Sequence, residues 1–506
     1  MKRFVIISIN LILLTGNAFS QTAYDAMSYS RNYAGGTARS EAMSGALGAL
    51  GGDISVLNSN PAGLAVYRGS EFTFTPSFNI NSTSANYGGT VFDDKKSRLL
   101  LNNIGYVYTK NTYNETGLKS VSFGLSYNRL SDFSSNAFIK NSSSASSMLD
   151  EFVLNANFGY NRNGQSITNE DDFDDFYERL AWKTFAIDWD DNNNEYFSDF
   201  DHEGRYEQLL LRSMRFKGGI SEYSFSIGTN VNNNFFWGAT LGIQSLNYSE
   251  SYSHKEETPG FEFMKSFEFE DLYSVDGVGV NFKTGVIFRP IQALRIGAAI
   301  HTPTSFNMNP YHRTKMVTQW NKSPELNSDS RVYADNHEEY YESHKIRTPW
   351  RYNINAAGVF GRIGMIGAEM EILNYGSGKI MPTSNFEDKS IYDDENALIS
   401  NDYKTAINLK TGAEFRLGPL YLRGGMAYYG TPFNKDAFKN DQIILDTIKE
   451  TLSFSGGIGF RHRDFYMDAA YSFMKHPEKI NLLYEYEWTK LQTNSNKIVV
   501  TFGFRF

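Results

Sequence analysis

The sequence predicts an all-β fold: a 14-stranded antiparallel transmembrane β-barrel with an N-terminal hatch (plug) inside the lumen. Three observations predict it. Strand-length segments of alternating polarity fill most of the chain, the connections between them alternate short and long, and a glycine-rich segment precedes the first strand. Composition agrees, because 15% of residues are aromatic while mean hydropathy is only −0.43. After residue 20, no apolar run approaches the ~18 residues that a membrane-spanning helix needs.

The final ten residues, KIVVTFGFRF, show the alternation most clearly. Ile498, Phe502 and Phe506 fall on one face of the predicted strand, and polar or small residues fall on the other. The same pattern recurs throughout the chain. Fourteen strands are expected, at 70–80, 101–112, 119–131, 221–231, 235–250, 276–290, 292–302, 350–361, 362–374, 404–417, 419–431, 451–462, 463–474 and 495–506.

The connections favour a barrel over a soluble β-sandwich secreted to the periplasm. Every second connection is tight, such as 232–234, whereas those between them are long, such as 81–100, 132–220 and 251–275. Short turns at one end and long loops at the other are typical of bacterial outer-membrane barrels. A closed barrel also pairs every backbone group, as lipid requires. The even strand count places both chain ends on the side of the short turns.

Residues 1–20 are expected to be a secretory signal peptide, because a charged start is followed by an apolar core and a small-x-small cleavage site at Ala18-Phe19-Ser20. The apolar core, Phe4 to Leu14, is too short to span a membrane. The predicted domains are therefore the signal peptide, a hatch over 21–69, and a barrel with long extracellular loops over 70–506.

The hatch segment is rich in glycine and alanine and lacks strand alternation. Its glycines do not form a phosphate-binding loop, because no strand precedes them and no Lys-Ser/Thr follows. A barrel of fourteen strands encloses more space than its own side chains fill. We therefore expect this segment to occupy the lumen.

Three motifs in the hatch segment carry a family resemblance: GTARS at 36–40, GALGGDIS at 48–55, and Asn60-Pro61-Ala62-Gly63-Leu64 just before the first strand. With these motifs the chain resembles the FadL-type family of outer-membrane transporters for long-chain fatty acids and other hydrophobic compounds. The resemblance is specific over about residues 36–70 and only architectural over the barrel.

The resemblance implies passive uptake of a hydrophobic small molecule. External loops would capture the ligand, an internal apolar pocket would receive it, and a gap in the barrel wall would release it sideways into the membrane. In the family, the Asn-Pro-Ala turn faces an inward kink of the third strand, which here implies a hatch and lateral-gate site of Asn60, Pro61 and Ala62 opposite Gly124. Some relatives are instead secretion-apparatus partners that dock proteins, and this alternative stays open.

The loop at 132–220 is acidic and contains a series of apolar and aromatic residues that we interpret as either a ligand-capture groove or the loop's own core: Phe173, Phe176, Tyr177, Leu180 and Trp182. In the same loop, Asp188-x-Asp190-x-Asn192 is similar to the start of a calcium loop, but it lacks the required glycine and the distal glutamate. A solvated acidic loop is favoured over a metal site.

Other function classes are disfavoured by what the sequence lacks. A net charge of −9 argues against a nucleic-acid partner, and zero cysteines exclude thiolate chemistry. No catalytic motif occurs in a defined strand–turn context, so we expect neither an enzyme nor a cofactor or metal. His337 and His344 share a loop without a spacing that supports haem. The expected partners are a hydrophobic ligand, outer-membrane lipid and lipopolysaccharide, and the barrel-assembly machinery through Phe506; the resemblance implies a monomer.

Overall fold

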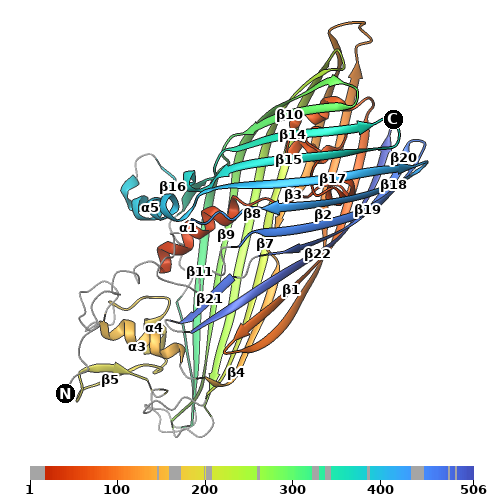
Figure 1. The fold of residues 1–506 in the computed structure, drawn as a ribbon. Helices are drawn as coiled ribbons and strands as arrows, with labels where there is room; N and C mark the ends of the chain where they lie inside the picture. Colours follow the sequence, from red (N-terminus) through yellow and green to blue (C-terminus); the bar gives the residue numbers. More distant parts are fainter. Residues whose placement is uncertain are drawn as a thin grey trace, which may run out of the picture.

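Fourteen spans form a closed antiparallel barrel in the structure, a computed structural model (Figure 1). It describes residues 17–144, 147–158, 172–198, 200, 208–258, 263–321, 330–336, 343–384, 388–434, 449–476, 479–484 and 487–506. Each span pairs with the next, and the pairing of the last strand with the first closes the ring. The spans are β1 (Glu71–Tyr87), β2 (Thr90–Asn111), β3 (Leu118–Asp132), β7 (Gln208–Val231), β8 (Phe235–Glu257), β9 (Met264–Ile291), β10 (Leu294–His301), β14 (Arg351–Phe360), β15 (Gly364–Asn374), β17 (Thr405–Leu417), β18 (Leu420–Tyr429), β19 (Thr451–His462), β20 (Phe465–Lys475) and β22 (Glu487–Arg505). The fold predicted from sequence is confirmed.

Several spans are interrupted and resume as a further strand towards the end with the long connections. β4 (Ser135–Ser144) follows β3, β11 (Ser305–Trp320) follows β10, and β16 (Lys379–Pro382) follows β15. The strand β13 (His344–Arg347) precedes β14, while β12 (Ser330–Asp335) and β21 (Lys479–Tyr484) pair at the ends of β11 and β22.

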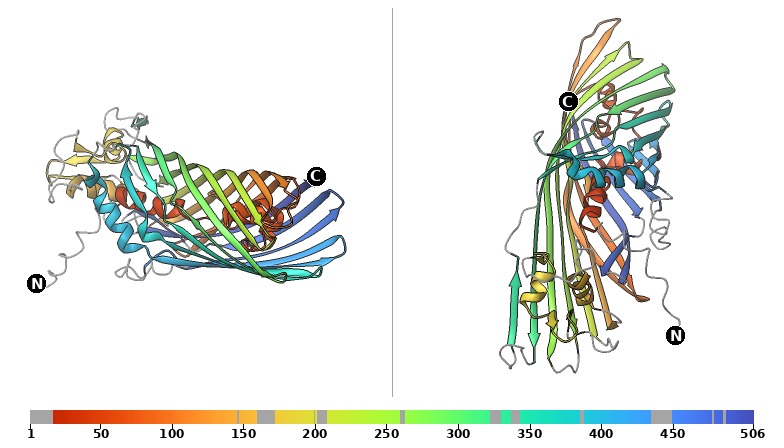
Figure 2. Two further views of the ribbon diagram at one scale, coloured as in Figure 1. Left: turned by 90° about the horizontal axis from the view of Figure 1, so that it is seen from above. Right: turned by 90° about the vertical axis from the view of Figure 1, so that its left-hand side faces the viewer.

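The barrel wall is much taller on one side than on the other (Figure 2). The strands β7, β8 and β9 have 24, 23 and 28 residues, whereas β14, β15 and β18 have 10, 11 and 10. At about 3.3 Å per residue, the longest strand measures roughly 90 Å, three times the hydrocarbon thickness of a bilayer. A cap of α3 (Met148–Phe158), α4 (Glu178–Lys183), β5 (Asp188–Asp190) and β6 (Glu195–Phe197) packs at the tall end.

The prediction of long loops at 81–100 and 251–275 is wrong. The segment 81–100 is a hairpin in which β1 and β2 stay paired to Tyr87 and Thr90 around Gly88-Gly89, and residues 251–257 and 266–275 continue the β8–β9 ladder. Beyond the membrane, both faces of a strand carry polar side chains, as in SESYSHKEE at 249–257, so alternation ends although pairing continues.

The outward face of the barrel carries the apolar alternation. Phe72, Phe74 and Phe78 are exposed on β1, and Ile498 and Phe504 are exposed on β22. The backbone of the terminal residue, Phe506, exchanges two hydrogen bonds of 3.0 Å with Ser70. Among the described residues, no helix is long and apolar enough to cross a membrane.

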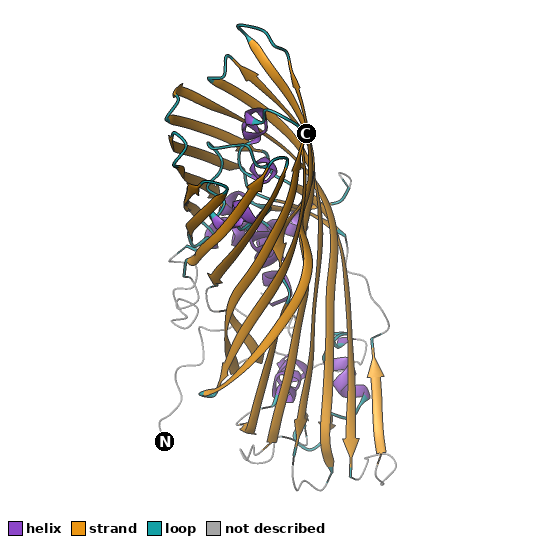
Figure 3. Ribbon diagram, turned by 90° about the vertical axis from the view of Figure 1, so that its right-hand side faces the viewer, coloured by secondary structure: helices purple, strands orange, loops and turns teal. Residues whose placement is uncertain are grey.

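The hatch lies inside the ring of strands (Figure 3). It contains α2 (Ala38–Ala42) and two 3-10 helices, η2 (Ile54–Asn58) and η3 (Pro61–Val66), which contact strands around the barrel. The helix α1 (Asn17–Tyr29) precedes them and packs against α5 (Asp393–Asp402). Residues 1–16, most of the expected signal peptide, lie outside the described residues.

Candidate functional site

The hatch is attached to the wall through Asn60. Its side chain accepts a hydrogen bond from the backbone N–H of Ala62 (3.1 Å), which caps η3, and donates to Val286 O (3.1 Å) and to the amide oxygen of Asn355 (3.2 Å). Pro61 occupies the first helical position, where no backbone donor is required. One side chain therefore both starts the helix and joins it to β9 and β14.

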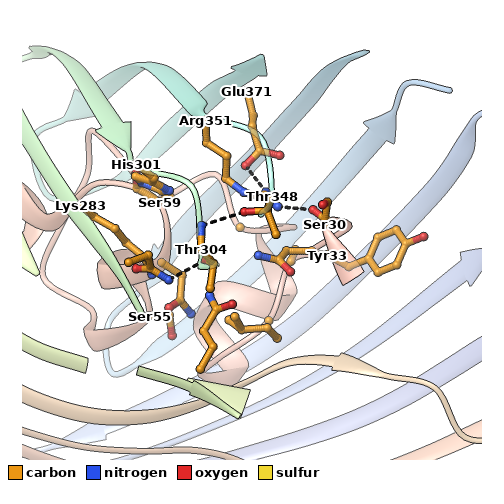
Figure 4. A pocket seen from close by; sticks show the side chains of 18 of the residues that line it. Ser30, Tyr33, Ser55, Ser59, Lys283, His301, Thr304, Thr348, Arg351 and Glu371 are labelled. Atoms are coloured by element: carbon orange, nitrogen blue, oxygen red, sulfur yellow. Dashed lines mark hydrogen bonds and ion pairs between the residues drawn. The ribbon is translucent and has the colours of Figure 1, made fainter. Parts of the chain in front are cut away.

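Next to the hatch, the lumen holds a polar cavity of about 70 Å³ in which charges face one another (Figure 4). The Arg351 guanidinium forms an ion pair with Glu371 at 3.0 Å and donates to the carbonyl of Ser30. His301 contacts the carbonyl of Ser59 at 2.9 Å. These contacts join hatch and strands across the cavity, so they hold the hatch against the wall.

Two lysines reach the same cavity and are likewise paired. Lys410 lies 2.9 Å from Glu369, and Lys283 pairs with the fully buried Glu222. Gln244 also donates to Glu222, at 2.8 Å. Burial of charge is costly without partners, so each lysine depends on its carboxylate.

A separate apolar layer crosses the lumen between this cavity and the barrel end that carries the long connections. One face of α1, including Met27, packs against wall residues such as Leu130, Phe306 and Leu373, and Ile399 of α5 closes it. Ser30, the residue that Arg351 contacts, comes directly after α1. The polar and apolar levels of the lumen therefore meet where this helix ends.

The ladder between β2 and β3 is interrupted beside the apolar layer. The β2–β3 ladder ends at the pair Asn103–Asn128, although β2 continues to Thr90 on its other edge with β1. Beyond this point β3 shifts register at Arg129, and β4 pairs with β7 alone. We call this interruption the seam: residues 90–102 of β2 facing residues 129–144 of β3 and β4, without ladder pairing in the part of the chain described.

Side chains span the seam where the backbone does not. Asn79 donates to Asp132 at 2.9 Å, and Arg98 hydrogen-bonds Ser134 while lying 3.8 Å from Asp132. Leu130, between the shifted residues, is buried in the apolar layer. Phe92 of β2 and Phe138 of β4 also pack across the seam, with ring centroids 5.8 Å apart, so both polar and aromatic side chains bridge it.

The gate residues predicted from the sequence lie at two different parts of the wall. Asn60 contacts β9 and β14, and a Cβ on Gly238 of β8 would lie 2.3 Å from Pro61 O. Ala62 packs against Phe236 and Ile287. At Gly124 the neighbouring hatch residue is Leu64, 3.1 Å from where a Cβ would be. The hatch therefore packs against β3 through Leu64, two residues after the predicted triplet.

The predicted capture residues lie inside the cap. Phe173, Phe176 and Leu180 are buried there, and Tyr177 and Trp182 pack against them. Phe176 stacks on His312 of β11 with ring centroids 4.3 Å apart. This arrangement matches the second interpretation of the series, a core within the loop; a ligand-capture role stays a prediction.

The acids of the cap have structural partners. Asp190 accepts hydrogen bonds from the backbone of Asn192 (2.8 Å) and the side chain of Asn193 (2.7 Å), which lower its pKa and shape the β5–β6 turn. Burial raises the pKa of Glu178 from its ordinary value of 4.5 to about 8, although Asn155 donates to it at 2.9 Å. No cluster of three or more metal-ligating side chains occurs within the described ranges.

Sequence reasoning did not find the seam or the ion pairs. Inward-facing charges such as Lys410 and Glu414 were visible in the strand pattern, but their partners on neighbouring strands depend on register. The two glycines at 218–219, with φ of 107° and 154°, were the available signal that the wall deviates near Arg129.

No family model matches the chain, and no curated protein matches its sequence. Among solved structures, it is similar to a Pseudomonas aeruginosa FadL homologue, with a TM-score of 0.52, 15% identity, and coverage of 94% of this chain and 100% of that one. It is also similar to the P. putida toluene transporter TodX, with a TM-score of 0.52, 12% identity, and coverage of 93% and 99%. The chain therefore has the FadL-type fold.

Proposed function

We propose that this protein is an outer-membrane channel through which hydrophobic small molecules, long-chain fatty acids among them, diffuse passively and leave sideways into the membrane. The apolar outer face of the barrel supports residence in a membrane. The fold, shared with a FadL homologue and a toluene transporter, supports the outer membrane and this class of cargo.

The two levels of the lumen favour a lateral route. A hydrocarbon gains about 0.8 kcal/mol for each methylene buried in an apolar environment, whether protein or lipid. To continue straight through, it would have to pass Lys410, Arg351 and their buried carboxylates, where it would separate paired charges. Passage from the apolar layer directly into lipid avoids both costs.

The observation that carries the proposal is the end of the β2–β3 ladder at Asn103–Asn128, next to Leu130 of the apolar layer. Where neighbouring spans stay paired, a molecule leaving sideways would have to break backbone hydrogen bonds between strands. At the seam there is no β2–β3 ladder to break, although β4 packs against β2 there.

The test is to lock the seam with a reversible cross-link. The chain contains no cysteine, so Asn79→Cys combined with Asp132→Cys introduces a single pair, at positions whose side chains are 2.9 Å apart. We expect the oxidised protein in vesicles to lose at least about 90% of oleate and naphthalene uptake, and reduction to restore it.

A matched pair in an intact ladder controls for the cross-link itself. Ala356 and Ala368 are paired between β14 and β15, and their cysteine variants should transport normally in either redox state. Unchanged uptake in the locked seam variant would rule out the lateral route. Wild-type protein that transports neither cargo would instead favour the protein-docking alternative.

A further inference from the structure

The end of the barrel that carries the short turns is basic, although the whole chain has a net charge of −9. Exposed or half-buried arginines follow one another around this rim from the β9–β10 turn to the last strand: Arg289, Arg295, Arg362, Arg416, Arg461, Arg463 and Arg505. Among the residues described, only Arg461 and Arg505 are in ion pairs, with Asp468 and Glu71. One exposed acid, Asp464, lies in these turns. Positive charge is therefore left without a counter-ion along the rim.

An apolar groove crosses the outer face of the wall next to these arginines. It has a volume of about 470 Å³. Its apolar lining is exposed and includes Phe360, Ile363, Ile366, Phe415 and Leu422. Small residues form its floor, since Ala413 of β17 pairs with Gly424 of β18, and the row continues to Gly456 of β19. The groove therefore lies in the band of the wall that faces lipid.

No backbone requirement explains the two glycines of this row. Neither has a positive φ, and a Cβ would have its nearest neighbour 3.9 Å away on Gly424 and 3.7 Å away on Gly456. Glycines on the inner face of the wall differ, because a Cβ on Gly412 would lie 2.6 Å from Met43 O of the hatch. The inner glycine makes room for the hatch, whereas the outer pair leaves a hollow in the surface.

Arg362 and Arg416 lie together at the short-turn end of the groove. The backbone N–H of Arg416 donates to Ile363 O at 2.7 Å, which places it next to the β14–β15 turn that contains Arg362. The Arg416 guanidinium donates to Gly418 O at 3.1 Å, and neither arginine has a carboxylate partner in the part of the chain that the structure describes. Arg416 follows Ala413 by three residues, roughly 10 Å along the strand. Two cations and an apolar hollow are therefore within reach of one lipid molecule.

We propose that the groove and its two arginines bind an anionic phospholipid of the surrounding membrane, with an acyl chain in the groove and the phosphate between Arg362 and Arg416. A guanidinium presents a planar set of donors that matches phosphate oxygens. The partner is a lipid rather than an acidic protein, because a protein at the rim would leave the lipid-facing groove unfilled. The site is on the outside of the barrel, so it does not depend on what passes through the lumen.

The experiment compares lipids that share their chains and differ in the charge of the head group. Full-length protein in dodecyl maltoside is titrated with palmitoyl-oleoyl phosphatidylglycerol or with the zwitterionic phosphatidylcholine, and native mass spectrometry gives the Kd of the first bound lipid. We expect the wild type to prefer phosphatidylglycerol. Arg362→Gln combined with Arg416→Gln should weaken phosphatidylglycerol binding about tenfold, the loss typical of a charge-assisted hydrogen bond, and leave phosphatidylcholine binding unchanged.

Gly424→Phe tests the groove, because its side chain would fill the hollow. We expect it to weaken the binding of both lipids at least about fourfold, the equivalent of one buried methylene. The matched control is Arg68→Gln combined with Lys110→Gln, which removes two exposed cations beside β1 and β2 and leaves the groove intact. An equal loss in this control, or unchanged binding in Gly424→Phe, would overturn the inference. Equal binding of the two lipids by the wild type would also overturn it, and would assign the basic rim to an acidic protein instead.

Discussion

Two levels of the lumen, separated by the end of α1, are built from opposite chemistry. The hatch level is held by ion pairs such as Arg351–Glu371 and Lys410–Glu369, both nearly inaccessible to solvent. The apolar layer is held by side chains such as Phe306 and Met308, which have no exposed surface. The wall is continuous around the first and interrupted beside the second.

The difference shows that one lumen can hold a directional polar level and a non-directional apolar level next to each other. At the hatch level, Arg39 pairs with Glu414 of β17 at 3.0 Å and Glu41 pairs with Lys497 of β22 at 2.8 Å, so a shift of the hatch would leave buried charges without their partners. The apolar layer has no such directional bonds, because it is held by the burial of apolar side chains. The first three predictions below each perturb one level and leave the other intact, and the fourth perturbs the cap outside both.

The largest effect is expected from Lys410→Met, which removes a cation from the hatch level and leaves Glu369 buried without its partner. We expect the free energy of unfolding, measured by urea titration in vesicles, to fall by about 4 kcal/mol. The double variant with Glu369→Gln should recover part of this loss, because the uncompensated charge is gone. A double variant no more stable than Lys410→Met would show that the pair does not organise this level.

Phe306→Ala tests the apolar layer. The substitution leaves a cavity among Leu246, Val275 and Leu373, and we expect it to lower the free energy of unfolding by about 3 kcal/mol. A dry apolar cavity binds benzene-sized molecules. Calorimetry should therefore detect toluene binding to the variant that exceeds binding to the wild type, whereas equal binding would mean that the layer collapses around the deletion.

Gly238→Ala tests the contact between hatch and wall by close packing alone, without a change of charge. The new methyl group would lie 2.3 Å from Pro61 O, and overpacking of this kind costs about 1–3 kcal/mol. We expect a displaced hatch and a higher single-channel conductance in planar bilayers. Gly424→Ala is the control, since its nearest neighbour is 3.9 Å away; equal conductance in the two variants would contradict the prediction.

The smallest effect on the molecule as a whole is expected in the cap, which lies outside both levels. The raised pKa of Glu178 means that the folded cap keeps a proton that the unfolded segment loses above its ordinary value of 4.5. Cap stability should therefore be greatest below pH 4.5 and fall as pH rises through about 8. Hydrogen exchange over 148–158 and 172–198 should show this trend, Glu178→Gln should remove it, and the exposed Glu195→Gln should not.

Sequence alone predicted the spans well, because lipid imposes the alternation on which the prediction rests. β3 was expected at 119–131 and runs from Leu118 to Asp132, and β19 was expected at 451–462 and matches. The predicted strand ends were wrong where the apolar alternation stops. β9 begins at Met264 rather than 276, because a paired strand that faces water can be polar on both faces.

The candidate site was predictable only in part. The capping role of Asn60 follows from its place before Pro61, a local signal that a single sequence contains. The seam was not predictable, because it depends on where the β2–β3 ladder stops, and Asn103 and Asn128 are not unusual strand residues.

The tall strands also determine when the cap can form. Its helices come from 148–183, but the side chains that complete its core include Phe267 and Phe269 of β9 and Trp320 of β11, which follow much later in the chain. A nascent molecule that has reached only β8 holds a cap segment that lacks these aromatic side chains of its interior. The cap should therefore mature last although it is translated early, and it should fail as a graft on any other protein that lacks these three aromatic residues.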